Sequence, residues 1–598
     1  MKKLFAVCAI AGLASSVVIA ADKCGDVAFS QGFDESSVML GKAGTALLSS
    51  AQPRHPGKWL VNNYDRRITI SIAEMDGEKC VRLKLDRKDC DTDFSFRCDR
   101  FPVRGGSGFR ATFRVRGTFP MKDAQGQWGR GGTYIGWYDA DGNRLATEFH
   151  FGLSFDDSAW HDVSVEGHVP DKAVEAFIEL GSDAPNFKKD QTLCIANAKF
   201  AHVDAASVAR VEIARPAPLT TDLAPGVEPM AKGLVTLRDD GMTLIDGKPF
   251  FPIGIYSVNR CAANSNNLEL AFRQLKDAGF NLVHTYDWKR GAEYTEYLDL
   301  AEKYGMKLLN NPSSPIEKRV LEERARPNML AWYLADDASK RTTPEKLREK
   351  SLTVKRYDNA HLTAQADSLG NAYKTRYADF IGSTDVFLPE IYTACGDHEI
   401  GHEVLFVDYQ VKAVFRELAE AGNQVKGVWP ILQQFKGWKG WKRYPTQREI
   451  RAMSYVSIVD GAHGLTWYTY ASARPAPGNF GAADDPKAWA DLASVTRELS
   501  AIQDDLASRK AKQQPKATIA SGPKHDIFGN ASIHSILKEG VNGPLLIAVN
   551  TAPEKVSAHF SVSGATRAEV LFENRIIAVG DGFSDNFEPN AVHVYHLK

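Results

Sequence analysis

The sequence lacks the marks of several large classes of protein. Lys and Arg total 73 against 74 for Asp and Glu, so there is no basic surplus to bind nucleic acid or anionic lipid. Beyond the first 20 residues no segment is apolar for the length that a membrane-spanning helix needs, and we expect no membrane span. The chain has no internal repeat and no low-complexity tract.

Cysteine is scarce and lacks the paired C-x-x-C spacing of a zinc site. One of the eight cysteines, Cys8, lies in the N-terminal apolar segment, and five of the other seven lie in the first 200 residues. In an oxidising compartment one or two disulfides are expected among these five. Cys90 and Cys98, with seven residues between them, are candidates to close a small loop.

The first 20 residues are typical of a secretory signal peptide. Lys2 and Lys3 give the charged start, residues 4–19 the short apolar stretch, and Ala20 the cleavage position. Cys24 has no convincing lipoprotein box before it, so we expect no lipid anchor. The sequence therefore predicts an exported bacterial protein, periplasmic or extracellular, and leaves its oligomeric state open.

The length of 598 residues is enough for about three domains. We predict a β-sandwich over residues 21–205, a Pro-rich linker over 206–232, a barrel over 233–508 and a second β-sandwich over 509–598. In the first domain, runs such as 67–72, 108–115 and 174–180 alternate apolar and polar residues, as sandwich strands do. The terminal domain has five such runs, at 531–537, 544–550, 557–563, 567–572 and 591–596.

Residues 160–170, followed by an apolar strand and then residues 194–200, resemble the jelly-roll modules that accompany carbohydrate-active enzymes. The resemblance covers the later half of the domain. It implies a carbohydrate-binding-like module, and a sandwich that serves only as a structural spacer is the alternative.

In the middle of the chain, apolar strands alternate with amphipathic helices. The predicted strands are 250–258, 281–288, 307–311, 330–336, 361–367, 385–393, 425–435 and 464–471. Helical patterns between them include 267–278, 293–304, 344–357, 403–421 and 446–460, and a last helix covers 486–508. Eight strand–helix units over roughly 260 residues match a (β/α)8 TIM barrel. The alternative, an open doubly wound sheet, should have a Gly-rich phosphate turn after its first strand, and Gly254-Ile-Tyr-Ser-Val is not one.

The reacting groups of such a barrel lie at the carboxyl ends of its strands. These ends concentrate carboxylates, amides and aromatic rings, the groups that bind the hydroxyls and the C–H faces of a sugar. The candidate substrate-binding residues are Tyr256, His284, Tyr286, Asp287, Tyr333, Asp336, Gln365, Asp367, Tyr392, Gln433, Trp438, Trp467 and Tyr468. The pattern predicts a carbohydrate partner and neither a cofactor nor a metal.

Several segments resemble glycoside-hydrolase-like barrels related to the large retaining-hydrolase clan. Residues 328–337, NMLAWYLADD, are similar to the W-Y-L-x-D-E-P strand of those proteins, and residues 385–392, 433–435, 444–453 and 461–468 are similar to their later strands. The resemblance implies hydrolysis of O-glycosidic bonds and says little about which sugar is cleaved. The first function that we consider is therefore a glycoside hydrolase that acts on a plant, algal or host polysaccharide fragment. The chain departs from the pattern with Asp337 in place of Glu, Ala338 in place of Pro, and Gln433 and Gln434 where the clan carries its nucleophilic Glu.

The carboxylate pair predicted to be catalytic is Asp337 and Glu390. Glycoside hydrolysis needs one protonated carboxyl group to assist the leaving oxygen and one ionised carboxyl group to attack or to activate water. Asp337 is assigned as the acid and Glu390 as the nucleophile or base, with the reverse assignment and both stereochemical courses left open.

Two other functions are compatible with the sequence. The missing carboxylate on strand seven suits a catalytically silent barrel that only binds glycans. His398, Glu399 and His402 match the H-E-x-x-H signature of zinc hydrolases, but Gly401 interrupts the helix that this signature requires.

Overall fold

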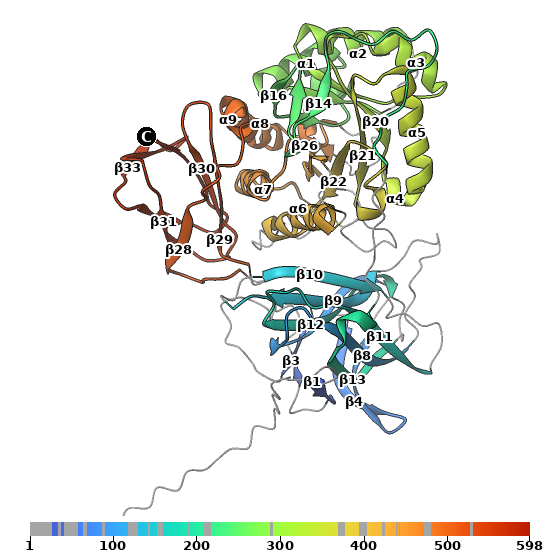
Figure 1. The fold of residues 1–598 in the computed structure, drawn as a ribbon, viewed down its shortest axis with the longest axis vertical. Coiled ribbons are helices and arrows are strands. Elements are labelled where there is room, and N and C mark those ends of the chain that lie inside the picture. The colour runs from blue at the N-terminus through green and yellow to red at the C-terminus, as the bar shows by residue number, and fades with distance from the viewer. Residues whose placement is uncertain are drawn as a thin grey trace, which may run out of the picture. The chain divides into compact units, whose positions relative to one another are not determined.

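The computed structural model describes residues 27–33, 38–40, 58–63, 68–85, 90–117, 130–140, 144–151, 159–187, 192–208, 217–286, 291–368, 377–393, 403–420, 422, 425–437, 441, 443–471, 480–526 and 530–598. Two compact units make up the chain, Met1–Val211 and Glu212–Lys598 (Figure 1). The predicted signal peptide lies outside the described residues. None of the helices that the structure describes is both long and apolar enough to cross a membrane.

The first unit is a sandwich of two sheets. Its strands are β1 Val27–Gln31, β2 Val38–Leu40, β3 Trp59–Asn63, β4 Ile68–Met75, β5 Glu78–Leu85, β6 Cys90–Cys98, β7 Phe101–Pro102, β8 Gly108–Arg116, β9 Arg130–Tyr138, β10 Arg144–Phe151, β11 Trp160–His168, β12 Glu175–Phe187 and β13 Thr192–Val203. One sheet has the order β11-β8-β13-β5-β4 with β1 on β13, and the other has β10-β9-β12-β6-β3-β2 with β7 on β12.

The alternating sequence of β8 shows why this unit is a sandwich. Phe109, Phe113 and Val115 face the core, while Arg110 between them is exposed. Because successive side chains of a strand point to opposite faces, one face of the sheet is apolar and is buried against the other sheet. The predicted sandwich is confirmed.

The predicted loop between Cys90 and Cys98 is wrong. These residues are the two ends of β6, a continuous nine-residue strand. Eight steps of about 3.3 Å separate their Cα atoms by roughly 26 Å, whereas a disulfide needs less than about 7 Å. Cys98 is a buried free thiol whose sulfur accepts a hydrogen bond from the Ile178 N–H at 3.1 Å.

The second unit contains a closed barrel of eight parallel strands. They are β17 Ile253–Ile255, β18 Leu282–His284, β19 Lys307–Asn310, β20 Met329–Ala335, β21 Leu362–Asp367, β22 Val386–Ile391, β24 Ile431–Gln433 and β26 Leu465–Tyr468. Strand β26 pairs with both β17 and β24, and β21 pairs with β22, so the ring is closed. The predicted (β/α)8 barrel is confirmed, and the open sheet is excluded.

Helices cover the outside of the ring (Figure 1). They are α1 Leu268–Asp277, α2 Ala292–Lys303, α3 Ile316–Glu323, the short α4 Ala338–Arg341, α5 Pro344–Tyr357, α6 Glu403–Glu420, α7 Gln447–Val459, α8 Pro486–Ala501 and α9 Gln503–Leu506. Side chains that accept hydrogen bonds from the first turn fix where several of them begin: Asn267 before α1, Thr343 before α5, Thr446 before α7 and Asp485 before α8.

A small antiparallel sheet of β14 Val235–Leu237, β15 Thr243–Ile245 and β16 Lys248–Phe250 precedes the barrel. Its Val235 lies in the same apolar cluster as the residues inside the ring, and the Val235 N–H donates to the Ala360 carbonyl just before β21. The small sheet therefore covers the amino-terminal end of the barrel.

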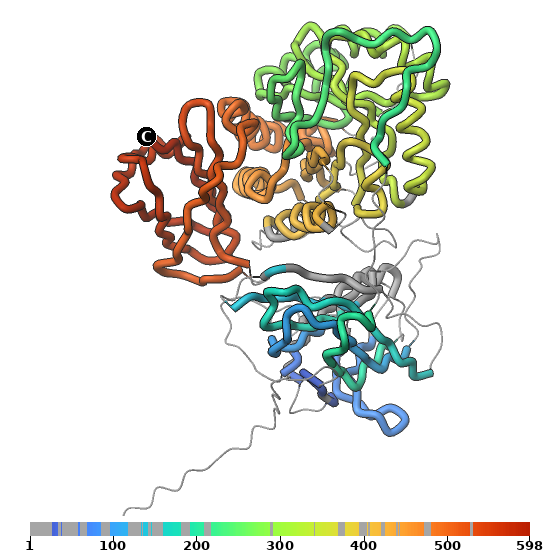
Figure 2. The backbone as a smooth tube through the Cα atoms, viewed as in Figure 1, coloured from blue at the N-terminus to red at the C-terminus, as the bar shows by residue number. Residues whose placement is uncertain are grey.

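The second unit ends in another two-sheet sandwich. Its strands are β28 Lys516–Ser521, β29 Ile533–Lys538, β30 Leu545–Asn550, β31 Val556–Ser561, β32 Arg567–Val570, β33 Arg575–Ala578, β34 Phe583–Phe587 and β35 Val592–Leu597. The sheet orders are β28-β31-β34 and β29-β30-β35-β32-β33. Ile547 and Val594 of the larger sheet share one apolar cluster with Ile450 and Val456 of α7. This sandwich thus packs on the barrel helices through α7 (Figure 2).

Candidate active site

An aromatic cluster lies at the carboxyl-terminal end of the barrel. Its members sit at or near the carboxyl ends of five strands, β17, β18, β20, β22 and β26: Tyr256, His284, Tyr286, Tyr333, Tyr392 and Tyr468. Because all eight strands are parallel, their carboxyl ends meet at one rim, and residues from distant parts of the chain become neighbours. The sequence predicted all six residues for this site.

His284 is the centre of this aromatic cluster. Its ring centroid lies 4.3 Å from that of Tyr256, 4.6 Å from Tyr333 and 4.9 Å from Tyr286. Burial lowers the pKa of His284 to about 3, so the imidazole is neutral at physiological pH. The ring therefore adds no positive charge to the site.

Tyr468 links the two sides of the aromatic cluster. Its ring lies 6.2 Å from Tyr256 and 5.9 Å from Tyr392. Partial burial raises the pKa of Tyr468 to about 12, and the negative charges of Asp336 and Glu390 contribute to the shift. The tyrosine hydroxyls consequently remain protonated and can donate hydrogen bonds to sugar oxygens.

Two carboxylates, Asp336 and Glu390, lie beside the aromatic cluster. The hydroxyl of Tyr333 donates a hydrogen bond to Asp336 Oδ1 at 2.7 Å. Burial raises the pKa values of Tyr286 and Tyr392, and the charges of both Asp336 and Glu390 raise them further. Both carboxylates, one at the end of β20 and one on β22, therefore interact electrostatically with the same tyrosines.

Asp337, the neighbour of Asp336, lies in a different environment. It precedes α4 in the left-handed region, with a φ of 50°, and its Oδ2 lies 3.7 Å from Arg341 Nη2. Burial raises the pKa of Asp367 to about 6, and the charge of Asp337 contributes to that shift. The same Arg341 Nη2 lies 4.0 Å from Asp336 Oδ2, so the guanidinium group is near both carboxylates, while Asp336 also accepts the hydrogen bond from Tyr333.

Three predicted binding residues are tied into the barrel wall. Both carboxylate oxygens of Asp367 accept hydrogen bonds from Ser339, at its N–H and its hydroxyl. Gln365 Oε1 accepts from the Thr384 hydroxyl at 3.0 Å, and Gln433 Nε2 donates to the Phe435 carbonyl at 3.1 Å. These hydrogen bonds fix the strand ends in place. All three side chains are buried.

Trp467 lies on the outer side of the barrel wall. It is fully buried among the helices, and its ring lies 6.0 Å from that of Phe280. Since successive residues of a strand face opposite sides, Tyr468 faces the aromatic cluster and Trp467 does not. The other predicted residues, Asp287, Trp438, His398, Glu399 and His402, lie outside the described residues.

Two aromatic residues that were not among the predicted binding residues extend the cluster. Phe435 packs on Tyr392 with ring centroids 5.1 Å apart, and Trp441 lies 6.1 Å from Tyr392. The indole N–H of Trp441 donates to the Tyr392 carbonyl at 3.1 Å. Their sequence signal was the aromatic segment that follows strand seven.

A buried ion pair holds this segment in place. Arg443 donates two hydrogen bonds of 2.7 Å to the carboxylate of Glu449 in the first turn of α7. Glu449 also accepts from the Thr446 N–H at 2.7 Å, completing a capping box. The wall that carries Trp441 is therefore anchored to a helix end.

No protein-family model matches the chain, and no curated protein has a matching sequence. A solved structure named as a glycoside hydrolase is 16% identical, with 63% of this chain and 98% of that one covered and a TM-score of 0.42. A glycoside hydrolase family 5 protein from Bacteroides vulgatus is 16% identical over 61% and 93% of the two chains, with a TM-score of 0.41.

The endo-1,4-β-D-xylanase 10B of Clostridium thermocellum is 11% identical over 75% of this chain and 96% of that one, with a TM-score of 0.29. The second unit contains a closed (β/α)8 barrel.

Proposed function

We propose that the chain is an exported glycoside hydrolase that cleaves O-glycosidic bonds of a poly- or oligosaccharide at the aromatic cluster. The observation that carries this proposal is that Asp336 and Glu390 lie beside the same tyrosines. Glycoside hydrolysis requires two carboxyl groups across the scissile bond, and aromatic rings suit the C–H faces of the sugar.

Asp336 takes the role of the ionised carboxylate, and Glu390 that of the acid. A hydrogen bond donated by the Tyr333 hydroxyl stabilises the charged form of Asp336. Glu390 stands on β22 beside the same rings and is assigned as the acid, because it is the second carboxyl group of the pair that glycoside hydrolysis requires. This assignment replaces Asp337 by Asp336 in the predicted pair, because Asp336 accepts the hydrogen bond from Tyr333 in the aromatic cluster.

The spacing of the strands fits this chemistry. Strand β21 lies between β20 and β22, so at about 4.8 Å per strand their backbones are roughly 10 Å apart. Side chains that lean inward from this separation reach the roughly 5–9 Å needed between the carboxyl groups of glycosidases. The range includes both the retaining and the inverting course.

One observation favours a second candidate function, a barrel that binds glycans without cleaving them. Gln433 stands where the resembling hydrolases carry a Glu nucleophile, and its amide donates to the backbone carbonyls of Phe435 and Arg443. An amide in this position cannot attack an anomeric carbon. We extend the proposal to the first unit as a carbohydrate-binding sandwich, which would serve either function.

A reducing-sugar assay of the purified chain across a polysaccharide panel tests the proposal. We expect product release from at least one polymer and its loss in Glu390→Gln. Binding on a glycan array without product from any polymer would replace the proposal by the glycan-binding function. Activity that requires zinc and disappears in His402→Ala would instead support the H-E-x-x-H alternative.

A further inference from the structure

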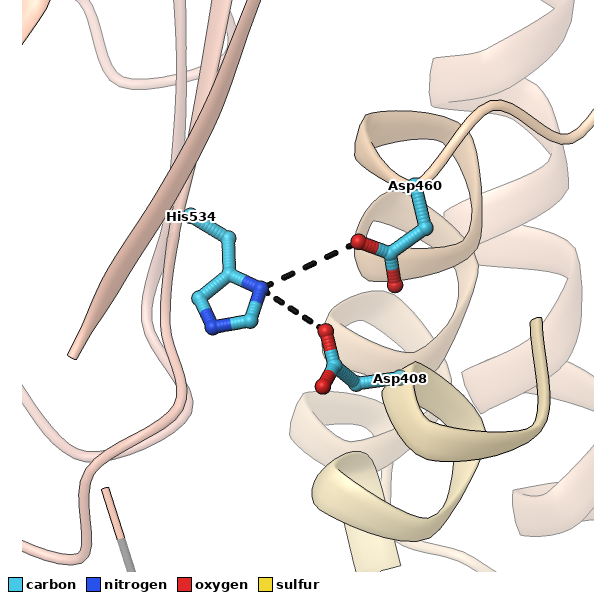
Figure 3. A group of neighbouring side chains, drawn as sticks. All are labelled: Asp408, Asp460 and His534. Carbon is cyan, nitrogen blue, oxygen red and sulfur yellow. Dashed lines mark ion pairs between the residues drawn. The ribbon is translucent and has the colours of Figure 1, made fainter. Parts of the chain in front are cut away.

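A buried cluster of charged side chains joins the barrel to the terminal sandwich, within the second unit. Asp408 comes from α6, Asp460 follows α7, and His534 comes from β29 (Figure 3). Their side chains are 0, 3 and 5% exposed, respectively. Asp526, fully buried, lies behind the imidazole, with its Oδ2 at 3.9 Å from His534 Nε2. Isolated charges are expensive at such depth, so these carboxylates require a positive charge beside them, from a side chain or from an ion.

The distances between the oxygen and nitrogen atoms suit a metal ion. His534 Nδ1 lies 2.8 Å from Asp408 Oδ1 and 3.9 Å from Asp460 Oδ1. One ligand atom from each of the three residues lies within 4.8 Å of the others. Ligand atoms that surround a divalent ion at about 2.0–2.2 Å lie roughly 3–4 Å apart, so small side-chain movements close the site.

The ammonium group of Lys412 already marks the centre of the cluster. Its Nζ lies 2.6 Å from Asp408 Oδ1, 3.7 Å from Asp460 Oδ1 and 3.3 Å from His534 Nδ1. One positive charge therefore occupies the point that the three ligand atoms share. The Lys412 side chain is 43% exposed, so it reaches the cluster from the solvent and can turn back toward it.

The hydrogen-bonding capacity of His534 conflicts with this arrangement. Nδ1 faces the Asp408 carboxylate, which requires an N–H, and also the Lys412 ammonium, which requires a lone pair. One of the two contacts is repulsive with either form of the ring. Two further atoms, Asp460 Oδ2 and His534 Nε2, are buried without a hydrogen-bond partner among the described residues. A metal ion in place of the ammonium turns the lone pair and the carboxylates into ligands.

We propose that Asp408, Asp460 and His534 bind a divalent transition-metal ion that ties α6 and α7 to the terminal sandwich. Asp408, Asp460 and Asp526 together carry three negative charges. These balance the two positive charges of the metal ion and the one of the Lys412 ammonium, which is displaced to the rim of the site. Carboxylate oxygens with one imidazole nitrogen suit Zn²⁺ or Mn²⁺, whereas Ca²⁺ and Mg²⁺ prefer oxygen ligands alone. The role is structural, because the ligands are buried between packed elements. This site goes beyond the proposed hydrolase function and does not depend on it.

Zinc titration of the tag-free full chain, stripped with a chelator, tests the proposal. By calorimetry we expect one equivalent of Zn²⁺ to bind and, by mass action, the unfolding temperature to rise. Asp460→Asn should weaken binding at least tenfold, while the exposed control Asp504→Asn should not change it. Lys412→Met should tighten binding, because it removes the competing cation.

The same titration contains the results that would overturn the proposal. No Zn²⁺ binding by either the stripped chain or Lys412→Met would show that the cluster is an ion-pair network only. Binding that persists unchanged in Asp460→Asn but is lost in His402→Ala would place the zinc at the H-E-x-x-H segment instead. Asp460→Asn keeps the size of the side chain, and a thermal melt of each variant verifies that it is folded.

Discussion

At the scale of single residues, Asp336 and Asp337 show how one turn separates two adjacent carboxylates. Asp336 accepts from Tyr333 in the aromatic cluster, whereas Asp337 takes a left-handed conformation and precedes α4. The sequence could predict that an acidic pair ends strand four. It could not predict which member faces the tyrosines, because this depends on the conformation of one residue in the turn.

Asp367 provides a stability prediction at the same scale. Its pKa is raised to about 6, chiefly by burial, so the folded chain prefers the protonated form. The pKa of an Asp carboxyl group in the unfolded chain is near 4, and below that pH the free energy of unfolding keeps the full contribution of the protonated group. The contribution is lost as the pH rises through about 6, and the loss amounts to at most about 3 kcal/mol. Asp367→Asn keeps an acceptor for Ser339 and removes the charge. We expect a higher unfolding temperature than wild type at pH 7.5, and a difference that shrinks toward pH 4.5.

Differential scanning calorimetry of Asp367→Asn at both pH values measures this effect. The exposed Asp379→Asn on the neighbouring 3-10 turn is the matched control, and we expect it to follow wild type at both pH values. A variant that is less stable than wild type at pH 7.5 would contradict the account. It would mean that the charge of Asp367, rather than its shape, holds Ser339.

At the scale of elements, the segment between β24 and α7 is a wall of the site that depends on one buried ion pair. Glu449 is fully buried, and Arg443 supplies both of its cationic hydrogen bonds. Arg443→Met leaves the carboxylate without its cation, which typically costs about 3–5 kcal/mol. We expect urea to unfold this variant at a clearly lower concentration and substrate binding to weaken as Trp441 loses its support.

Arg448→Met is the control for that change, because Arg448 is an exposed residue of the same helix. We expect its unfolding midpoint to lie within about 0.5 kcal/mol of wild type. An Arg443→Met chain as stable as wild type would show that the capping box alone holds Glu449.

Most barrel elements could be predicted from sequence, and the misses have local physical causes. The predicted strand 250–258 breaks near Pro252, and 425–435 breaks near Pro430, since proline cannot donate a ladder hydrogen bond. Helix α3 was missed because it spans only eight residues. Both Trp467 and Tyr468 were predicted to bind substrate, although neighbouring residues of a strand face opposite sides. A mostly apolar strand hides which face meets the helices, and the structure places Trp467 among them.

At the scale of the whole molecule, the first unit has a core of its own, whereas the barrel and the terminal sandwich of the second unit share one. Unit Glu212–Lys598 shares one apolar cluster between the barrel, α7 and the larger terminal sheet. Unit Met1–Val211 has a core of its own around Trp59 and Trp137. The sequence predicted three domains from composition, but it could not show that the last two share a core, since that depends on long-range packing.

This difference predicts the outcome of truncation. A chain of residues 212–598 should fold and keep the barrel's activity, because its cluster remains complete. A chain of residues 212–508 should be insoluble or molten, since removal of Ile547 and Val594 exposes the apolar face of α7. Circular dichroism and calorimetry of the two chains test this. A cooperative melt of 212–508 at the temperature of 212–598 would contradict the shared core.

The most direct test of the central claim is the rate of sugar release by three matched amide variants, Asp336→Asn, Asp337→Asn and Glu390→Gln. The substrate is the polymer identified in the panel, and glycan binding is measured on the same preparations. We predict that Asp336→Asn and Glu390→Gln lose at least about a hundredfold in kcat with binding retained, while Asp337→Asn stays within about tenfold of wild type. Full activity in Glu390→Gln, or loss in Asp337→Asn with Asp336→Asn active, would contradict it.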